Sequence, residues 1–148
     1  KRKNEINGVD YYFLDVNEFK NKIKADEFIE WEEVYANNFY GTLKSEITKI
    51  WSHNKHVIFD VDVVGGISLK KYFSESALSI FIEPPSIDIL EQRLKSRNTD
   101  SLEAIKTRVN KAKEELEYKK SFDQCLINDD LNTTLFAAEN IIKEFLLK

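Results

Sequence analysis

Two aspartates, Asp60 and Asp62, stand near the end of a nearly continuous apolar run, 57–64. Such a run is typical of a strand buried on both faces of a parallel sheet, and residues two apart on a strand share a face. Two neighbouring carboxylates repel each other unless a cation lies between them. Ligands of open α/β sheets bind beyond the carboxyl ends of the strands, so the pair favours a Mg²⁺–water or a phosphate–lysine site. The alternative is a pair of strand-end acids that cap a turn at Gly65-Gly66.

Three arginines form a second candidate. Arg93 and Arg97 are four residues apart, which places them on one face of a predicted helix, and Arg108 lies on the next helix. Planar guanidinium groups make paired contacts with phosphate, so the three side chains could clamp a polyphosphate. The alternative is a solvated helical hairpin whose arginines pair with Glu91 and Glu103.

An aromatic and acidic segment near the start of the chain carries Tyr11, Glu30, Tyr40 and Thr42. A carboxylate such as Glu30 can accept two parallel hydrogen bonds from a base with adjacent N–H donors. Guanine presents such a pair at N1 and N2, and adenine does not. Taken by themselves, these residues favour the plainer interpretation, in which the tyrosines are half-buried packing residues and Glu30 is an exposed strand acid.

Composition limits what this chain can do. Its 148 residues are about one domain's worth, with 42% hydrophobic and 32% charged residues, as in soluble globular proteins. A net charge of −4 argues against nucleic-acid binding, and one cysteine excludes an internal disulfide. No apolar run suits a membrane span, and no signal peptide opens the chain. These features predict a reduced, cytoplasmic protein, and we expect no metal site made of protein ligands alone.

Helices and strands in two regions of the chain must position these residues. Turn signals and periodicity first predict a small sheet region: strand 11–14, a helix with a capping box at Asp15 and Glu18, strands 27–34 and 39–40, and a helix capped by Thr42. The remainder is predicted as strand 57–64, helix 67–73, strand 77–82, a helix capped by Ser86, a helix with a capping box at Asp100 and Glu103, strand 124–127 and a last amphipathic helix. This order implies an α/β layer fold with a parallel sheet.

Seven stretches, in order and with matching spacing, resemble guanylate kinases across essentially the whole chain. They are 7–13 (NGVDYYF), 27–31 (EFIEW), 39–42 (FYGT), 59–62 (FDVD), 84–86 (PPS), 93–100 (RLKSRNTD) and 127–131 (INDDL). Each stretch is a weak signal alone, whereas the ordered set is specific.

The resemblance implies an enzyme that transfers the terminal phosphoryl group of ATP to GMP with Mg²⁺, giving ADP and GDP. It implies a three-layer α/β fold of the P-loop nucleoside-monophosphate-kinase type, with a parallel core sheet, a small GMP-binding β insert and a helical lid. The corresponding parts are 1–45 for GMP binding, 46–88 with 119–148 for the core, and 89–118 for the lid. The expected partners are the small molecules GMP and ATP, with no nucleic acid or membrane, in a monomer or homodimer.

The resemblance also assigns roles to residues. On the GMP side, Glu30 and Thr42 read the guanine, while Arg2, Tyr11 and Tyr40 hold the phosphate. The residues expected near the reacting phosphates, the magnesium ion and the ATP are Asp60, Asp62, Arg93, Arg97, Arg108 and Asn128. Of these, Asp62 is assigned to substrate, Asn128 and Arg97 to ATP, and Asp60 and the three arginines to catalysis.

Some features of the family pattern are missing. The glycine-rich phosphate loop and the first core strand would precede this sequence, so we expect a longer native protein and no activity from these 148 residues alone. Asn98 replaces a usual glycine and Val64 a frequent glutamine. One alternative is a catalytically inactive guanylate-kinase-like module that uses the GMP cleft to hold a ligand or peptide. Another is a kinase for a different nucleotide, although Glu30 with Thr42 favours guanine over adenine.

Overall fold

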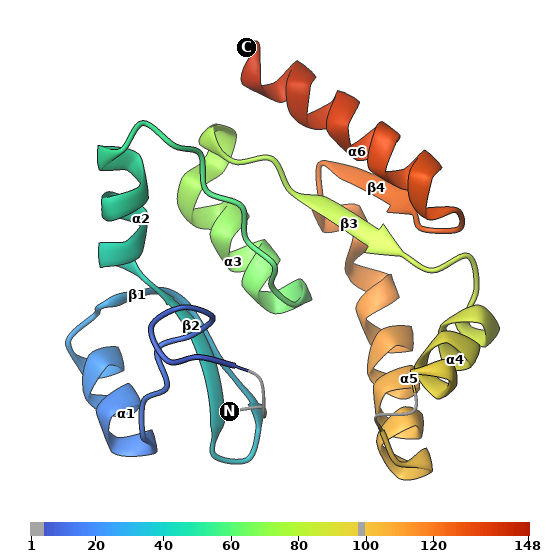
Figure 1. Cartoon of the computed structure of the whole chain (residues 1–148), viewed down its shortest axis with the longest axis horizontal. Helices are drawn as coiled ribbons and strands as arrows, with labels where there is room; N and C mark the ends of the chain where they lie inside the picture. Colours follow the sequence, from blue (N-terminus) through green and yellow to red (C-terminus); the bar gives the residue numbers. More distant parts are fainter. Residues whose placement is uncertain (1–4, 98–99) are drawn as a thin grey trace. The chain divides into compact units, whose positions relative to one another are not determined.

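The structure, a computed structural model, describes residues 5–97 and 100–148 (Figure 1). The chain divides into two compact units, Lys1–Leu69 (unit 1) and Lys70–Lys148 (unit 2). Helix α3 (Val63–Phe73) runs across the boundary between them. None of the helices within the described ranges is long and apolar enough to cross a membrane.

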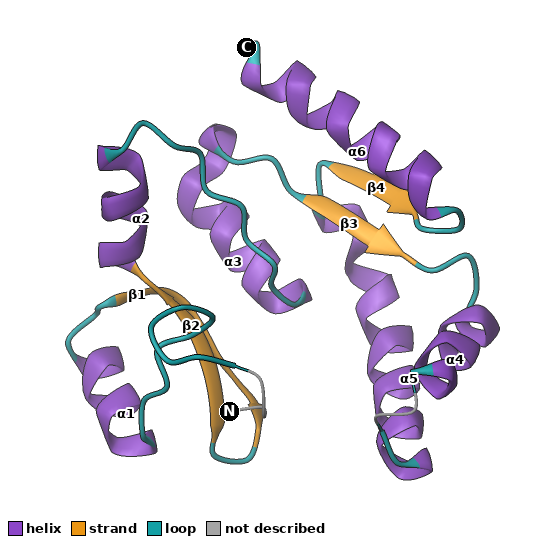
Figure 2. Cartoon of the chain, viewed as in Figure 1, coloured by secondary structure: helices purple, strands orange, loops and turns teal. Residues whose placement is uncertain are grey.

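Unit 1 is built on an antiparallel hairpin of β1 (Phe28–Tyr35) and β2 (Asn38–Leu43), with helices α1 (Val16–Lys24) and α2 (Lys44–Ser52) beside it (Figure 2). Both strands are predicted from the sequence, β1 by its alternation of acidic and apolar residues and β2 by the turn signal that precedes it. The predicted capping box of α1 is confirmed, because Asp15 accepts from the first turn and Glu18 accepts from the backbone of Asp15.

Aromatic rings form the core of unit 1. The buried Phe19 of α1 stacks on Phe28, with centroids 4.4 Å apart, and on Phe39, at 5.3 Å. Ile47 of α2 is buried as well. Burying a side chain of this size stabilises the fold by about 2 kcal/mol, so these contacts hold both helices to the hairpin.

Two local predictions for unit 1 are wrong, for related reasons. Residues 11–14 form no strand, because local hydrogen bonds use the backbone of this segment: Asn7 accepts from the Phe13 N–H, and the Gly8 N–H donates to Tyr11. Thr42 does not cap α2, since it lies within β2 and its hydroxyl donates to Glu30.

The predicted strand 57–64 is also wrong. Residues 57–62 have no regular structure, and α3 begins at Val63 and includes both glycines that were expected to end the strand. A strand needs a partner for its backbone groups, and none of the described strands pairs with this run. Ile58 is accordingly 88% exposed rather than buried. The helix predicted for 67–73 is confirmed, with an earlier start.

Unit 2 contains a parallel pair of short strands, β3 (Ile80–Glu83) and β4 (Gln124–Ile127), as predicted. Its other elements are the short 3₁₀ helices η1 (Ser74–Ser76) and η2 (Glu117–Ser121) and the helices α4 (Ile87–Ser96), α5 (Leu102–Leu116) and α6 (Leu131–Leu146). Helix α6 lies along β4, and the Thr134 hydroxyl donates to the Ile127 carbonyl at 3.3 Å (Figure 1).

Helices α4 and α5 form a hairpin around their own small core of Leu94, Ile105 and Val109. Ser86 caps α4, as predicted. The predicted capping box of α5 is wrong: Ser101 caps the helix, and the Asp100 carboxylate pairs with Arg108 instead.

Candidate functional site

Unit 1 contains a groove of about 700 Å³. It is lined by the loop that precedes α1, by both strands of the hairpin, by the start of α2 and by the loop that precedes α3. Five of the residues that the sequence singled out line this groove: Tyr11, Glu30, Tyr40, Thr42 and Asp60. The groove is large enough for a nucleotide-sized ligand.

Glu30 and Thr42 face each other across the hairpin. They are opposite residues of β1 and β2, and the Thr42 hydroxyl donates to Glu30 Oε1 at 2.7 Å. Both side chains are partly buried. Because opposite side chains of an antiparallel pair are neighbours, the strand register itself brings the two together. The carboxylate is thereby oriented in the groove and keeps free acceptor capacity, since each of its oxygens has more than one lone pair.

Tyr11 and Tyr40 meet edge to face, with centroids 6.2 Å apart. Their side chains are 51% and 46% exposed, respectively. The two rings therefore contact each other while much of each side chain remains exposed. Both tyrosines line the groove, where their hydroxyls can serve as donors to a ligand.

The two aspartates differ in what they do. Asp60 is exposed in the groove, whereas Asp62 directly precedes α3 and accepts from the Gly65 N–H at 2.9 Å. Asp62 thus has the capping role that the sequence left as an alternative. Asp60 and Asp62 do not share a face of a strand, because residues 57–62 form no strand. Within the described ranges, no three His, Cys, Asp or Glu side chains come together as metal ligands.

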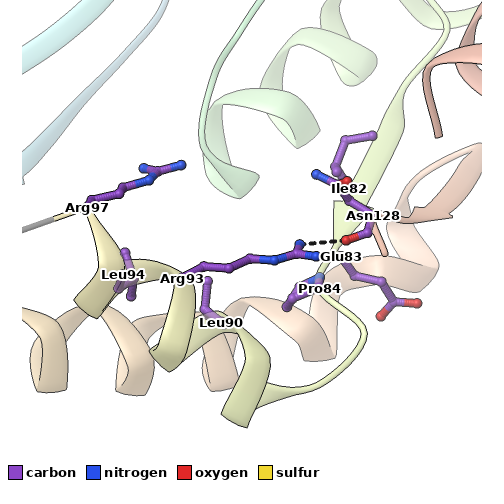
Figure 3. Close-up of a pocket in the computed structure, with 8 residues that line it drawn as sticks. All are labelled: Ile82, Glu83, Pro84, Leu90, Arg93, Leu94, Arg97 and Asn128. Atoms are coloured by element: carbon purple, nitrogen blue, oxygen red, sulfur yellow. Dashed lines mark hydrogen bonds between the residues drawn. The ribbon is translucent and has the colours of Figure 1, made fainter. Parts of the chain in front are cut away.

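Unit 2 has a separate cavity of about 220 Å³ near the end of β3, shown in Figure 3. Arg93 points across it and donates to the backbone carbonyls of Asn128, at 2.6 Å, and Asp129, at 2.9 Å. These bonds fasten α4 to the loop after β4. Arg97 lines the same cavity and is exposed, and its side chain forms no ion pair or hydrogen bond with another described residue.

Arg108 does not line this cavity. Its Nε lies 3.3 Å from Asp100 Oδ2, across the connection between α4 and α5. The alternative pairing of the arginines with glutamates is wrong for Glu91, which binds Lys95 at 2.6 Å. A hydrogen bond from Lys95 and its positive charge lower the pKa of Glu91.

Sequence reasoning missed a cluster at the end of β3. Lys119 Nζ lies 3.1 Å from Glu83 Oε2, and the Cys125 thiol donates to Glu83 Oε1 at 3.3 Å. The hydrogen bonds from Cys125 and then Lys119 lower the pKa of Glu83. Desolvation and the hydrogen bond and charge of Glu83 raise the pKa of the exposed Cys125 thiol, which favours its protonated form. Glu83 is far in sequence from both of its partners, so no local pattern could reveal the cluster.

Two residues that the sequence singled out, Arg2 and Asn98, lie outside the described residues. Val64, where the family often has glutamine, lies in α3 and is 54% exposed.

A family model described as guanylate kinase matches residues 1–145. The chain belongs to the guanylate kinase family. It is 51% identical over 145 residues to a guanylate kinase from Bacteroides fragilis, covering 98% of this chain and 71% of that one. It is 52% identical over 147 residues to a guanylate kinase from Porphyromonas gingivalis, covering 99% and 78%.

A solved structure gives the same answer for the fold. The crystal structure of guanylate kinase from Anaplasma phagocytophilum superposes with a TM-score of 0.82 at 28% identity, over all of this chain and 71% of that one. The predicted family, enzyme class and mixed α/β guanylate kinase fold are therefore confirmed. The chain's high identity to guanylate kinases favours the enzyme over the inactive binding module.

Proposed function

We propose that the groove of unit 1 binds GMP and that the chain contributes to the transfer of the terminal phosphoryl group of ATP to it, in the cytoplasm. The observation that carries this proposal is the Glu30–Thr42 pair, a carboxylate oriented inside a nucleotide-sized groove. The reaction consumes GMP and ATP and yields GDP and ADP.

Base selection follows from the chemistry of Glu30. A carboxylate only accepts hydrogen bonds, and guanine offers two adjacent donors at N1 and N2. Adenine would present the lone pair of its N1, which a carboxylate repels. Thr42 supports the choice by holding Oε1 in place at 2.7 Å. A site built to pair with donors rejects a base that lacks them, because its buried acceptor is then left without a partner.

The GMP phosphate is assigned to Tyr11 and Tyr40, together with Arg2 through the family resemblance. Both tyrosines line the groove with exposed side chains, which supports a role as hydroxyl donors to phosphate oxygens. Asp62, which is also assigned to the substrate, contributes by fixing the first turn of α3.

Phosphoryl transfer needs positioning and neutralisation of spread negative charge more than covalent chemistry from the protein. We assign this work to Arg93, Arg97 and Arg108, with Asn128 near the adenine of ATP. The exposure of Arg97 supports the assignment, because its donors are available to phosphate oxygens. We further propose the parts 1–45 for GMP binding, 89–118 as the lid, and the rest as a P-loop-type three-layer core.

Magnesium fits this scheme as an ion held mainly by the nucleotide. Mg²⁺ is commonly bound by one or two carboxylates plus substrate phosphates and water, and the exposed Asp60 suits that limited role. The ion would supply charge neutralisation at the phosphates.

A coupled assay of ADP release in the full-length enzyme tests the proposal. We expect turnover with GMP and none with AMP, and a loss of about a hundredfold in kcat/KM for GMP in Glu30→Gln. Glu27→Gln is the matched control, since Glu27 is an exposed acid next to β1 that pairs with Lys22 outside the groove. Equal turnover with AMP, or an unchanged Glu30→Gln variant, would contradict the proposal, and GMP binding without turnover would support the inactive module.

A further inference from the structure

Gly65 lies against the carboxylate that we assign to guanine. It is the third residue of α3 and is buried. A methyl group at this position would lie 3.3 Å from Glu30 Oε2, 3.3 Å from Asp62 Oδ1 and 3.2 Å from the Val61 side chain. All three distances are shorter than an ordinary van der Waals contact. The space beside Glu30 is thus open only because residue 65 has no side chain.

The orientation of the Glu30 carboxylate depends on what lies beside each of its oxygens. Thr42 donates to Oε1 at 2.7 Å, and a Cβ on residue 65 would lie 3.3 Å from Oε2. The first contact fixes one oxygen, and a methyl group beside the second would turn the carboxylate plane about it. Hydrogen bonds weaken steeply when their angles deviate, so the orientation of this plane decides whether both guanine donors are well placed.

Two of the three neighbours of an added methyl group cannot easily shift by themselves. Asp62 Oδ1 accepts from the Gly65 N–H at 2.9 Å, and the Asp62 carbonyl accepts from the Gly66 N–H at 2.8 Å, so Asp62 and the first turn of the helix are fixed to each other. The Val61 contact is with Cβ, which is attached directly to the backbone. Glu30 Oε2 is the end of a flexible side chain, so the Glu30 carboxylate is the neighbour that yields most easily.

We propose that Gly65 is a specificity-determining positioning residue, whose missing side chain keeps the Glu30 carboxylate in the orientation that accepts from both N1 and N2 of guanine. This inference rests on the proposed GMP site. It predicts that a side chain at position 65 harms recognition of the N2 amino group more than general nucleotide binding.

The test compares GMP with inosine monophosphate, which has the N1 donor and lacks the 2-amino group. In the full-length enzyme, Gly65→Ala should lower GMP affinity about tenfold and change that of inosine monophosphate less than twofold, as measured by calorimetry and by kcat/KM. Gly66→Ala is the matched control, because it adds the same methyl group one position along the same helix. The control should keep the wild-type ratio of the two affinities.

A folded Gly65→Ala variant with the wild-type ratio would overturn the inference and leave the proposed function intact. A wild-type enzyme that does not prefer GMP to AMP would overturn the proposed function itself. A second comparison decides the matter if Gly65→Ala does not fold. In a Glu30→Asp background the shorter carboxylate leaves room, so adding Gly65→Ala should leave the ratio unchanged within twofold, and a further tenfold loss would refute the proposal.

Discussion

The groove of unit 1 and the arginines of unit 2 are organised in different ways. In the groove, Glu30 and Thr42 are tied to each other across a strand pair, so the acceptor is in place before any ligand arrives. In unit 2, Arg93 is bound to backbone carbonyls, Arg108 pairs with one partly exposed acid, and Arg97 is exposed. Glu30 and Thr42 are thus preorganised for recognition, whereas the side chains of Arg97 and Arg108 are held only weakly.

Energetics supports this difference. The hairpin register keeps Glu30 and Thr42 opposite each other, so the two side chains remain neighbours as long as the strands are paired. The Arg108–Asp100 ion pair is partly solvent-exposed and contributes about 1 kcal/mol, so a phosphate can replace the aspartate at small cost. Unit 1 should therefore determine which nucleotide binds, and the arginines of unit 2 how fast the phosphoryl group moves.

The largest expected effect is on the rate. Arg97→Ala should lower turnover about a thousandfold, in the range observed when a phosphate-binding arginine is removed, and leave the melting temperature unchanged. Steady-state kinetics and thermal unfolding of the enzyme measure both quantities. Lys95→Ala, in the last turn of α4 and paired with Glu91, is the control and should lose less than twofold. Equal losses in both variants would remove Arg97 from the catalytic residues.

The next effect concerns the rigidity of the hairpin. A methyl group on Gly41 would lie 2.8 Å from the Glu30 carbonyl oxygen and 2.9 Å from Trp31 Cβ, so the strands would have to shift. Gly41→Ala should lower the free energy of unfolding by about 2 kcal/mol, as for other overpacked sites. Urea unfolding measures this, with Asn38→Ala at an exposed position of β2 as the control. A Gly41→Ala variant as stable as the control would mean that the hairpin is more adaptable than we infer.

A smaller effect separates the arginines from one another. Arg93→Ala removes two charge-assisted hydrogen bonds to the loop after β4 and should reduce the free energy of unfolding by about 1.5 kcal/mol. Arg97→Ala serves as its control and should cost less than about 0.5 kcal/mol, because an exposed side chain is removed. Chemical denaturation of the two variants provides the comparison, and identical losses would contradict the proposed division between a fastening arginine and an available one.

The smallest expected effect is a pH dependence of the free energy of unfolding that arises from Asp123 in unit 2. Burial raises the pKa of Asp123, but hydrogen bonds from the Ser79 backbone, Lys70 and the Ser79 hydroxyl outweigh it and hold that pKa below its ordinary value. A lowered pKa in the folded state stabilises the fold above the unfolded pKa of about 4, and this contribution disappears as the pH falls through the folded pKa.

Asp123→Asn should therefore cost about 1 kcal/mol at pH 7 and progressively less below about pH 4. Urea unfolding at pH 7 and at pH 3 measures the difference. The control is Glu75→Gln, which changes an exposed acid in η1. A cost that stays the same at pH 3 would mean that the Asp123 charge contributes nothing to stability.

Sequence reasoning succeeded where the signal and its partner are close in the chain. The capping box at Asp15, the Ser86 cap and the β1–β2 hairpin all depend on residues a few positions apart. It failed where a distant group competes: Thr42 donates to Glu30 rather than capping a helix, and Asp100 pairs with Arg108 rather than forming a capping box.

Only part of the candidate site could be predicted from the sequence. The types and spacing of the residues alone favoured packing for the tyrosines and a solvated strand for Glu30. The family resemblance supplied the roles in nucleotide binding. The contact of Gly65 with Glu30 joins residues far apart in the sequence, so no local sequence pattern could indicate it.

Calorimetric titration of the enzyme and its Glu30→Gln variant with GMP and with AMP tests the central claim most directly. The account predicts that the wild-type enzyme binds GMP at least a hundredfold more tightly than AMP, and that the variant loses most of this preference. Equal affinity of the wild-type enzyme for the two nucleotides, or an undiminished preference in Glu30→Gln, would contradict the claim that the groove of unit 1 reads guanine through Glu30.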